Sequence, residues 1–171
     1  MRVLVKGTGV AGLTAAFELA RRGVVVAVSE RAAAPFRGAS FYAGGMLAPW
    51  CERESAEERV LTLGKAALGW WDDATPGLVV RNGTLVIAPA RDKAELSRFA
   101  SRTSGYRSVN EAEIADLEPD LAGRFRSGLY FADEGHLDPR LALQSLYEQL
   151  CGMGVLFHMG VSVDEQRFDR V

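Results

Sequence analysis

The chain has 171 residues, of which 48% are hydrophobic and 25% are charged, a composition typical of a globular protein and not of a disordered tail. The formal net charge is −2 and the basic residues are scattered, so there is no electrostatic basis for nucleic-acid binding. No apolar stretch approaches the length of a membrane span, and Lys6 and Glu18 interrupt the first one, unlike a secretory signal. We therefore expect a cytoplasmic protein.

A GxGxxG motif lies between a strand-like apolar run at 3–5 and a helical pattern at 13–20. Its glycines are Gly7, Gly9 and Gly12. A second apolar run, at 24–28, is followed by the acidic residue Glu30. A strand, a glycine turn and a helix, with an acidic residue after the second strand, form the arrangement that binds a dinucleotide. The alternative is an ordinary strand-turn-helix in which the glycines serve packing alone.

Each glycine has its own expected role. Gly7 allows the tight turn, Gly9 lets a pyrophosphate approach the backbone, and Gly12 lets the helix pack closely on the strand. The first helical N–H groups, at Val10 and Ala11, then face the diphosphate at the positive end of the helix.

The acidic residue indicates which dinucleotide is bound. Glu30 is expected to accept hydrogen bonds from the adenosine ribose and to repel a 2′-phosphate, which favours FAD or NAD over NADP. We place the neighbouring Arg31 among the cofactor-binding residues as well. Lys6 stands where an apolar strand residue is usual, so this strand end is expected to be more exposed than in most such folds. Gly23 is suited to ending the helix.

The segment 37–52 is rich in small residues and follows a short connector at 32–36. It predicts an extended loop or an irregular helix, where an NAD-binding half would continue with a regular βα unit. Small residues also let the backbone approach a flat ligand closely.

The middle of the chain predicts mixed α and β structure. Ser55 and Glu58 form an expected capping box for a helix ending near Asp72. Asn82-Gly83 predicts a β-hairpin with a type I′ turn between runs at 78–80 and 84–88. The further expected elements are a helix at 92–102, a helix capped by Asn110 with Glu113 and stopped by Pro119, and a strand at 128–132.

The last part of the chain returns to an αβ pattern. Asp138 is a natural N-cap and Pro139 fits the first position of a helix running to Gly152. Strands are expected at 155–158 and around 161–163. The predicted organisation is a discontinuous nucleotide-binding domain, residues 1–45 and 139–171, into which an α+β domain, residues 46–138, is inserted.

These residues resemble the FAD-dependent amino-acid oxidases of the D-amino-acid oxidase and sarcosine oxidase group, and in particular the glycine oxidases of thiamine biosynthesis. The resemblance covers essentially the whole chain. It rests on the glycine motif with Glu30 and on Gly38-Ala39-Ser40, Ala43-Gly44-Gly45-Met46-Leu47-Ala48-Pro49, Asn82-Gly83-Thr84 and Gly135-His136-Leu137-Asp138-Pro139. It implies an α/β, Rossmann-like FAD-binding fold of the glutathione-reductase type, with part of an inserted substrate domain.

The resemblance also implies a cofactor site and a reaction. It places near the flavin Ala39, Ser40, Gly44, Gly45 and Met46, and it matches Val163 to the position whose backbone reads the adenine. For Ser40 a local cap, and for Met46 plain packing, remain equal alternatives. In such a family a small amino acid or amine loses a hydride from its α-carbon to flavin N5, and oxygen reoxidises the flavin to give hydrogen peroxide.

No catalytic residue is identified in this chain. In relatives an arginine pairs with the substrate carboxylate in the later half of the chain, and neither Arg167 nor Arg170 is assigned that role. Because such enzymes are about twice as long, and 169–171 resembles the middle of a hairpin, we expect an N-terminal piece. Its partners would be a complementary C-terminal chain or further copies of itself.

Three other functions stay open: a D-amino-acid dehydrogenase, a sarcosine-type dehydrogenase, or a catalytically incomplete fragment that binds FAD or another nucleotide. Neither cysteine has metal-ligand spacing, so no metal site or disulfide is expected, and Cys51 is interpreted as a buried small hydrophobe. His136 and His158 are interpreted as structural or surface histidines. Trp70 and Trp71 are interpreted as helix packing, and Trp50 as a marginal candidate for lining the active site.

Overall fold

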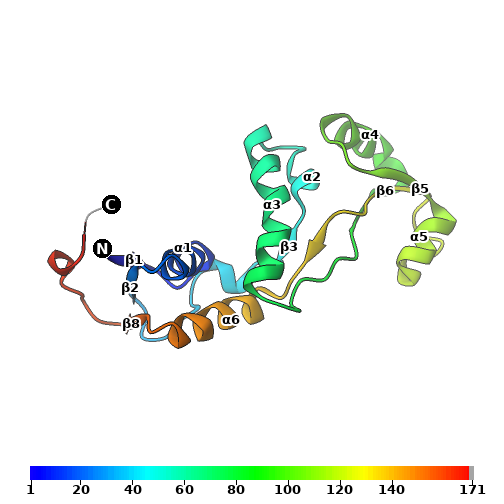
Figure 1. The fold of residues 1–171 in the computed structure, drawn as a ribbon. Coiled ribbons are helices and arrows are strands. Elements are labelled where there is room, and N and C mark those ends of the chain that lie inside the picture. Colours follow the sequence, from blue (N-terminus) through cyan, green and yellow to red (C-terminus); the bar gives the residue numbers. More distant parts are fainter. Residues whose placement is uncertain (170–171) are drawn as a thin grey trace. The chain divides into compact units, whose positions relative to one another are not determined.

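The computed structural model describes residues 1–169, and these fold as two compact units (Figure 1). The first unit combines Met1–Gly45 with the chain from Asp138 onward, and the second is Met46–Leu137. The hairpin expected at the end of the sequence falls largely on Arg170 and Val171, which lie outside the described residues.

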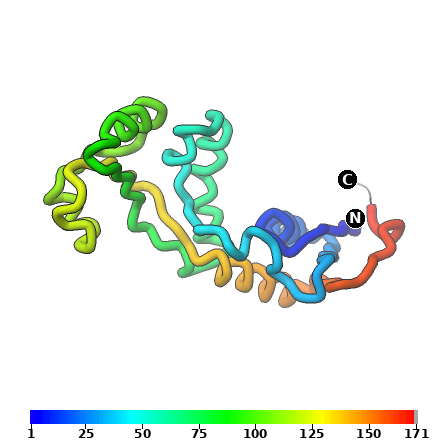
Figure 2. The backbone as a smooth tube through the Cα atoms, turned by 180° about the vertical axis from the view of Figure 1, so that it is seen from behind, coloured from blue at the N-terminus to red at the C-terminus, as the bar shows by residue number. Residues whose placement is uncertain are grey.

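The first unit is built on a parallel three-stranded sheet in the order β1 (Arg2–Lys6), β2 (Val25–Glu30), β8 (Leu156–Met159). Helix α1 (Val10–Arg21) connects β1 to β2, and α6 (Pro139–Gly152) precedes β8 and packs against α1. Apolar side chains from these elements form a core with at most 3% exposure: Leu13, Phe17, Val28, Leu143, Leu146 and Leu150. Figure 2 shows the backbone from behind, with the helical turns of α1 in blue and those of α6 in orange.

Both helices of the first unit begin or end where the sequence predicts. Gly23 adopts a left-handed φ of 77°, and its N–H donates to the carbonyl of Ala20, which closes α1. The Asp138 carboxylate accepts from the N–H groups of Arg140 and Leu141, which caps α6 directly before Pro139. These predictions are confirmed because every contact they need is local in sequence.

The strand predicted around 161–163 is wrong. After β8 the chain leaves the sheet at Gly160, whose φ is 64° and whose N–H donates to the carbonyl of Glu30. It continues irregularly into a 3-10 turn, η4 (Glu165–Arg167). Asp169 then donates its N–H to the carbonyl of Arg2, so this end of the described chain lies beside the start of β1, as Figures 1 and 2 show.

The segment after β2 is irregular, as predicted. Residues 31–45 contain only one short element, the 3-10 turn η1 (Ala39–Tyr42). The second unit opens with β3 (Met46–Leu47) and the one-turn helix α2 (Pro49–Glu52). No regular βα unit follows β2 in the described chain before the second unit begins.

The second unit contains an antiparallel sheet in the order β4 (Thr84–Ile87), β6 (Ser127–Phe131), β5 (Arg107–Asn110), and a two-stranded pair of β3 with β7 (Gly135–His136). Its helices are α3 (Glu58–Ala74), α4 (Lys93–Arg102) and α5 (Glu111–Leu117), with the 3-10 turns η2 (Ala90–Asp92) and η3 (Pro119–Leu121). The predicted Asn110–Glu113 capping box is confirmed in both directions. Strand β5 was not predicted.

The predicted hairpin at Asn82-Gly83 is wrong. Thr84 pairs with Phe131, and Val80 forms a bridge with His136, so both runs lie along the same returning segment and not along each other. Gly83 has the left-handed φ of 77° that a turn residue needs, but its N–H donates to the carbonyl of Glu134. Asn82-Gly83 therefore joins two stretches that pair with the same later segment, residues 131–136, and the two stretches do not pair with each other.

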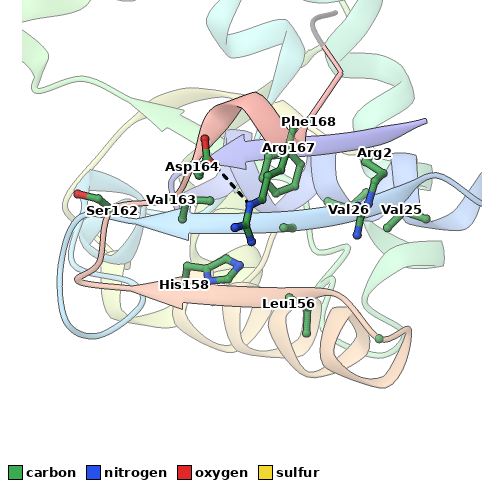
Figure 3. A pocket seen from close by; sticks show the side chains of 12 residues that line it. Arg2, Val25, Val26, Leu156, His158, Ser162, Val163, Asp164, Arg167 and Phe168 are labelled. Atoms are coloured by element: carbon green, nitrogen blue, oxygen red, sulfur yellow. Dashed lines mark ion pairs between the residues drawn. The ribbon is translucent and has the colours of Figure 1, made fainter.

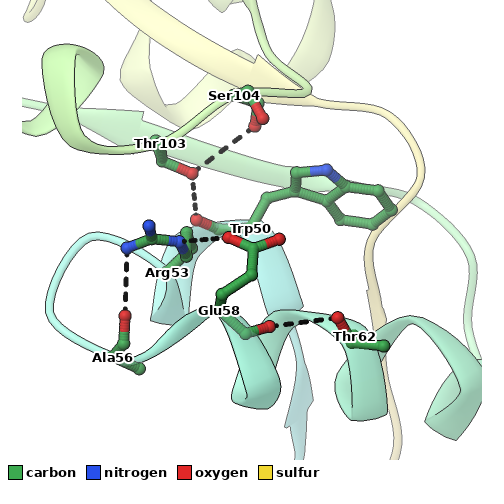
Figure 4. Close-up of polar contacts among 7 residues, drawn as sticks. All are labelled: Trp50, Arg53, Ala56, Glu58, Thr62, Thr103 and Ser104. Atoms are coloured by element: carbon green, nitrogen blue, oxygen red, sulfur yellow. Dashed lines mark hydrogen bonds and ion pairs between the residues drawn. The ribbon is translucent and has the colours of Figure 1, made fainter.

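The capping box predicted for α3 is also wrong. The helix begins at Glu58 after Glu57, and no side chain caps it. Ser55 belongs to the turn that follows α2, where its N–H donates to the carbonyl of Glu52. The Glu58 carboxylate instead accepts from Arg53 Nε at 3.0 Å, a contact drawn in Figure 4.

Candidate functional site

The glycine loop at the carboxyl end of β1 has the backbone geometry that its sequence predicts. Gly7 has a φ of 103°, a conformation that side-chain-bearing residues rarely adopt. A Cβ at Gly12 would lie 2.1 Å from the carbonyl oxygen of Gly7, so only glycine allows the helix this close to the loop. At Gly9 a Cβ would lie 3.1 Å from Ser40 Oγ. The turn and close-packing roles of Gly7 and Gly12 are thereby confirmed.

Glu30, at the carboxyl end of β2, reaches across to this loop. Its Oε2 accepts from the N–H of Thr8 at 3.0 Å and from the Thr8 hydroxyl at 2.9 Å. Its Oε1 accepts from the N–H of Ala32 at 3.0 Å. These donors, first Ala32 and then Thr8, hold the pKa of Glu30 below the usual carboxyl value, although partial burial raises it. The carboxylate is therefore ionised at neutral pH.

Thr8 is a site residue that the sequence reasoning missed. Its exposure is 1%, and its hydroxyl also accepts from the N–H of Phe36 at 3.2 Å. A signal was available, because the carboxyl ends of adjacent parallel strands meet at one sheet edge. A hydroxyl residue in the turn after β1 is thus placed near an acid at the end of β2.

A pocket of about 580 Å³ opens beside this loop. Four predicted cofactor-binding residues line it together: Gly7, Glu30, Arg31 and Val163. Lys6 also lines the pocket and forms an ion pair with Glu165 at 2.5 Å. Its side chain is 64% exposed, which confirms the expectation that this strand end is open. The pocket therefore combines the ionised Glu30, the Lys6–Glu165 ion pair, Arg31 and a glycine backbone.

Ser40 makes a contact that neither of its two alternatives predicts, and this contact occupies the N–H of Val10 that the sequence places at the diphosphate. Its Oγ accepts from the N–H of Val10 at 3.0 Å, which caps the first turn of α1 from a distant part of the sequence. The backbone of Gly9 passes directly beside the same oxygen. Ser40 thus fixes the start of α1, and the predicted flavin contact stays a prediction.

The other predicted flavin-side residues are exposed or conformationally special. Ala39 begins the η1 turn and is exposed, as is Gly44. Ala11, which is predicted to face the diphosphate and not the flavin, is exposed on α1. Gly45 has a left-handed φ of 70°. Met46 opens the second unit, where it pairs with His136 and is 58% exposed. The predicted contacts of these residues with a flavin stay predictions.

A second pocket, of about 400 Å³, lies on the sheet of the first unit beneath residues 162–168 (Figure 3). Its walls combine apolar strand residues such as Val25 and Leu156 with His158. Arg167 points into it and pairs with Asp164 at 3.3 Å. Arg167 is therefore engaged locally, in keeping with the sequence giving it no carboxylate-binding role.

The second unit holds a fully buried carboxylate, Glu134, which the sequence reasoning also missed. Its Oε1 accepts from the N–H groups of Trp50 and Cys51, both at 2.9 Å, and its Oε2 accepts from Cys51 Sγ at 3.1 Å. Cys51 is therefore a half-buried hydrogen-bond donor and not the plain hydrophobe that we expected. Burial and the neighbouring Glu134 raise the pKa of the Cys51 thiol, so it stays protonated and is a poor nucleophile.

Trp50 is held from several sides. Its carbonyl accepts from the Thr103 hydroxyl, as Figure 4 shows, and Lys65 Nζ lies 5.3 Å from the centre of its ring. A Cβ at Gly105 would lie 2.5 Å from the same ring. These contacts pack Trp50 within the second unit, and its expected place beside an active site stays a prediction.

Among residues 1–169, no helix is long and apolar enough to cross a bilayer. Over the same residues no group of three or more histidine, cysteine or acidic side chains could hold a metal ion.

Comparison with known proteins identifies relatives over nearly the whole chain. Residues 2–171 match the family described as FAD dependent oxidoreductase. A protein of Rhizobium etli named as a thiamine biosynthesis oxidoreductase, ThiO, is 62% identical over 146 residues, which are 85% of this chain and 45% of that protein. A D-amino acid dehydrogenase of Rhizobium rhizogenes is 28% identical over 162 residues, 88% of this chain and 35% of that protein. The chain thus spans less than half the length of each relative.

Solved structures show the same fold. The glycine oxidase of Geobacillus kaustophilus superposes with a TM-score of 0.75 at 22% identity, covering 95% of this chain and 48% of that one. The glycine oxidase of Bacillus cereus superposes with a TM-score of 0.74 at 19% identity, covering 94% of this chain and 47% of that one. The predicted fold class is confirmed.

Proposed function

The chain belongs to the FAD-dependent oxidoreductase family, and from this premise we propose that it supplies the FAD-binding part of an enzyme that oxidises a small amino acid or amine. The proposed reaction is that of a glycine oxidase, as in thiamine biosynthesis, with a cytoplasmic location. The similarity to the Rhizobium etli oxidoreductase supports the biosynthetic assignment. Because the chain spans 45% of that relative's length, we propose for it only the FAD-binding part of this activity.

The observation that carries the proposal is the contact between Glu30 and the glycine loop. The ionised Glu30 and Gly7, whose positive φ disfavours a side chain, line one pocket together, and Gly12 packs against the carbonyl of Gly7 where no side chain fits. A dinucleotide needs this pairing, because its diphosphate approaches the bare backbone while its ribose hydroxyls donate to the acid. The residues present therefore fit FAD.

We assign the cofactor-binding role as follows. Gly7, Gly9 and Gly12, with the N-terminal residues Val10 and Ala11 of α1, would face the diphosphate, and Glu30 with Arg31 the adenosine ribose. Val163 lines the same pocket as Glu30, which supports its proposed place beside the adenine. The flavin side would be met by Ala39, Ser40, Gly44, Gly45 and Met46. On this assignment 1–45 and 139–171 form the FAD domain, and 46–138 is part of the substrate domain.

When bound, FAD would accept a hydride from the substrate α-carbon, and we propose oxygen as the final electron acceptor. The residues of this chain would hold and orient the cofactor, and the ionised Glu30 would exclude a 2′-phosphorylated dinucleotide by charge repulsion. We assign no residue of this chain to the substrate carboxylate, and we propose a complementary chain or further copies of this one as its partners.

A second candidate is a dehydrogenase of the D-amino-acid or sarcosine type, which the Rhizobium rhizogenes relative favours. A third is a fragment that binds FAD or another nucleotide without turnover, which the length of the chain relative to both relatives favours.

Reconstitution separates these candidates. The purified chain is mixed with FAD, freed of unbound cofactor, and examined for flavin absorbance, alone and together with the later half of the Rhizobium etli oxidoreductase. We expect bound flavin, and peroxide from glycine or sarcosine only in the combined sample. Flavin reduction without peroxide would indicate the dehydrogenase, and bound flavin with no substrate reaction would indicate the fragment. No retained flavin in either sample would contradict the proposal.

A further inference from the structure

Thr8 lies between the first two glycines of the loop, and its buried hydroxyl has two partners. It contacts Glu30 Oε2 at 2.9 Å and the N–H of Phe36 at 3.2 Å. Chemistry settles the direction of both bonds, because an ionised carboxylate only accepts and a backbone N–H only donates. Thr8 therefore points its hydroxyl proton at Glu30 and accepts from Phe36.

These bonds decide what Glu30 can offer to a ligand. Oε2 accepts twice from Thr8, and Oε1 accepts once, from the N–H of Ala32. An ionised carboxylate has about four acceptor positions. The N–H of Arg31 also helps to lower the pKa of this carboxylate, and Oε1, which accepts fewer hydrogen bonds than Oε2, is the oxygen left to face a group in the pocket that Glu30 lines.

The same hydroxyl stabilises the connector that follows β2. Phe36 has a left-handed φ of 62°, an uncommon conformation for a bulky residue. Its N–H is held by Thr8, and its ring meets Tyr147 edge-on with centroids 5.7 Å apart. One buried hydroxyl thus joins the glycine loop, the end of β2 and the connector.

We propose that Thr8 is a positioning residue for ribose recognition: its hydroxyl holds Oε2 of Glu30 so that Oε1 faces one ribose hydroxyl of the bound dinucleotide. The inference rests on the proposed FAD-binding function. It requires a hydroxyl at this position and not merely a branched side chain. Thr8→Ser therefore keeps the hydroxyl that donates to Glu30 Oε2, and the nearly isosteric Thr8→Val removes it.

The first test measures nucleotide affinity by calorimetry on the 171-residue chain, using ADP and 2′,3′-dideoxy-ADP as probes. The wild-type chain prefers ADP, Thr8→Ser keeps that preference, and Thr8→Val lowers it by about 10-fold, as expected for a hydrogen bond made through a charged group. Thr14→Val is the matched control, because the Thr14 hydroxyl bonds only to carbonyls of its own helix, at Val10 and Ala11. An unchanged preference in Thr8→Val would overturn the inference.

The second test needs no ligand. The pKa of the Glu30 carboxyl is followed by carbon-detected NMR in the unliganded chain, where the charged groups lining the same pocket, Lys6, Arg31 and Glu165, are identical in all variants. Thr8→Val raises this pKa because a donor to the charged form is lost, and Thr8→Ser leaves it in place. An unchanged pKa in Thr8→Val would overturn the inference.

The two tests separate the inference from the proposed function. If the wild-type chain binds neither nucleotide, the proposed function fails for this chain, and the Glu30 pKa still decides the role of Thr8. If Thr8→Val does not fold, the Glu30 pKa and the ADP preference of Thr8→Ser test the inference. A raised Glu30 pKa or a lost ADP preference in Thr8→Ser would contradict a role that depends on the hydroxyl.

Discussion

Each unit of the molecule contains a glutamate that gathers hydrogen bonds from a neighbouring turn, but the two glutamates have opposite surroundings. Glu30 accepts from Thr8 and Ala32 while lining an open pocket. Glu134 accepts from Trp50 and Cys51 with no exposed surface. The same kind of interaction therefore leaves the Glu30 carboxylate open to a ligand in the pocket. At Glu134, where solvent does not reach the carboxylate, it holds α2 in place.

The difference predicts where each mutation acts. A buried carboxylate with only protein partners affects the free energy of unfolding, because removing it leaves its donors without water. A carboxylate at a pocket rim affects ligand affinity instead, because water replaces the lost partner.

The largest effect is expected for Glu134→Ala. It leaves the N–H groups of Trp50 and Cys51 and the Cys51 thiol without their acceptor in a buried place, so the free energy of unfolding should fall by about 3 kcal/mol or more. Urea unfolding measures this loss. Glu30→Ala is the matched comparison and should cost less than about 1 kcal/mol. Equal losses of unfolding free energy in the two variants would contradict the distinction between a structural Glu134 and a ligand-facing Glu30.

The next effect is expected for Gly12→Ala. Its Cβ would meet the carbonyl oxygen of Gly7 at 2.1 Å, so the loop must shift, which costs about 1–3 kcal/mol and abolishes ADP binding. Gly69→Ala is the control, because Gly69 lies in α3 with no atom within 4 Å of the added Cβ. That control should be neutral or stabilising by up to about 1 kcal/mol. A Gly12→Ala chain that melts and binds ADP like wild type would contradict the loop geometry.

A smaller effect is expected for Asp138→Ala, which removes the N-cap of α6. Two N–H groups, at Arg140 and Leu141, lose their acceptor but remain open to water, so the loss should be about 1 kcal/mol in thermal or urea unfolding. Asp138→Asn should retain most of the stability, since asparagine is an equally good cap. A loss of unfolding free energy as large as that of Glu134→Ala would show that the solvent exposure of the abandoned N–H groups does not determine the loss.

The smallest effect concerns pH. The folded-state pKa of Glu30 is lowered, so its contribution to stability is present above the ordinary carboxyl pKa and is lost as the pH falls through the lowered value. The difference in unfolding free energy between wild type and Glu30→Gln should therefore shrink on going from neutral pH to about pH 3. A difference that grows toward acid would have the wrong sign for a lowered pKa.

The sequence predicts correctly those features whose partners are near in the chain. The Gly7–Gly12 turn, the Asp138 cap and the Asn110 capping box depend on contacts within a few residues, and all are present. The capping box predicted at Ser55 is absent although its sequence is favourable, because Ser55 belongs to the turn after α2, where its N–H donates to the carbonyl of Glu52.

The missed features depend on distant partners. Thr8 and Glu30 are 22 residues apart, and Glu134 lies 84 residues from Trp50. Asn82-Gly83 has ideal hairpin residues, but a segment that returns much later in the chain supplies the pairing. Short-range patterns do not predict these contacts, because they depend on which distant segments the fold brings together. Only for Thr8 and Glu30 does the order of adjacent parallel strands give a signal.

The central claim is that the loop of Gly7 to Gly12, together with Glu30, binds an adenine dinucleotide without a 2′-phosphate. Calorimetric titration of the 171-residue chain with ADP and with ADP that carries an added 2′-phosphate tests it most directly. We predict that ADP binds and that the 2′-phosphorylated compound binds at least about 10-fold more weakly, because its extra charge meets an ionised carboxylate. Equal affinity for the two compounds, or no binding of ADP, would contradict the account.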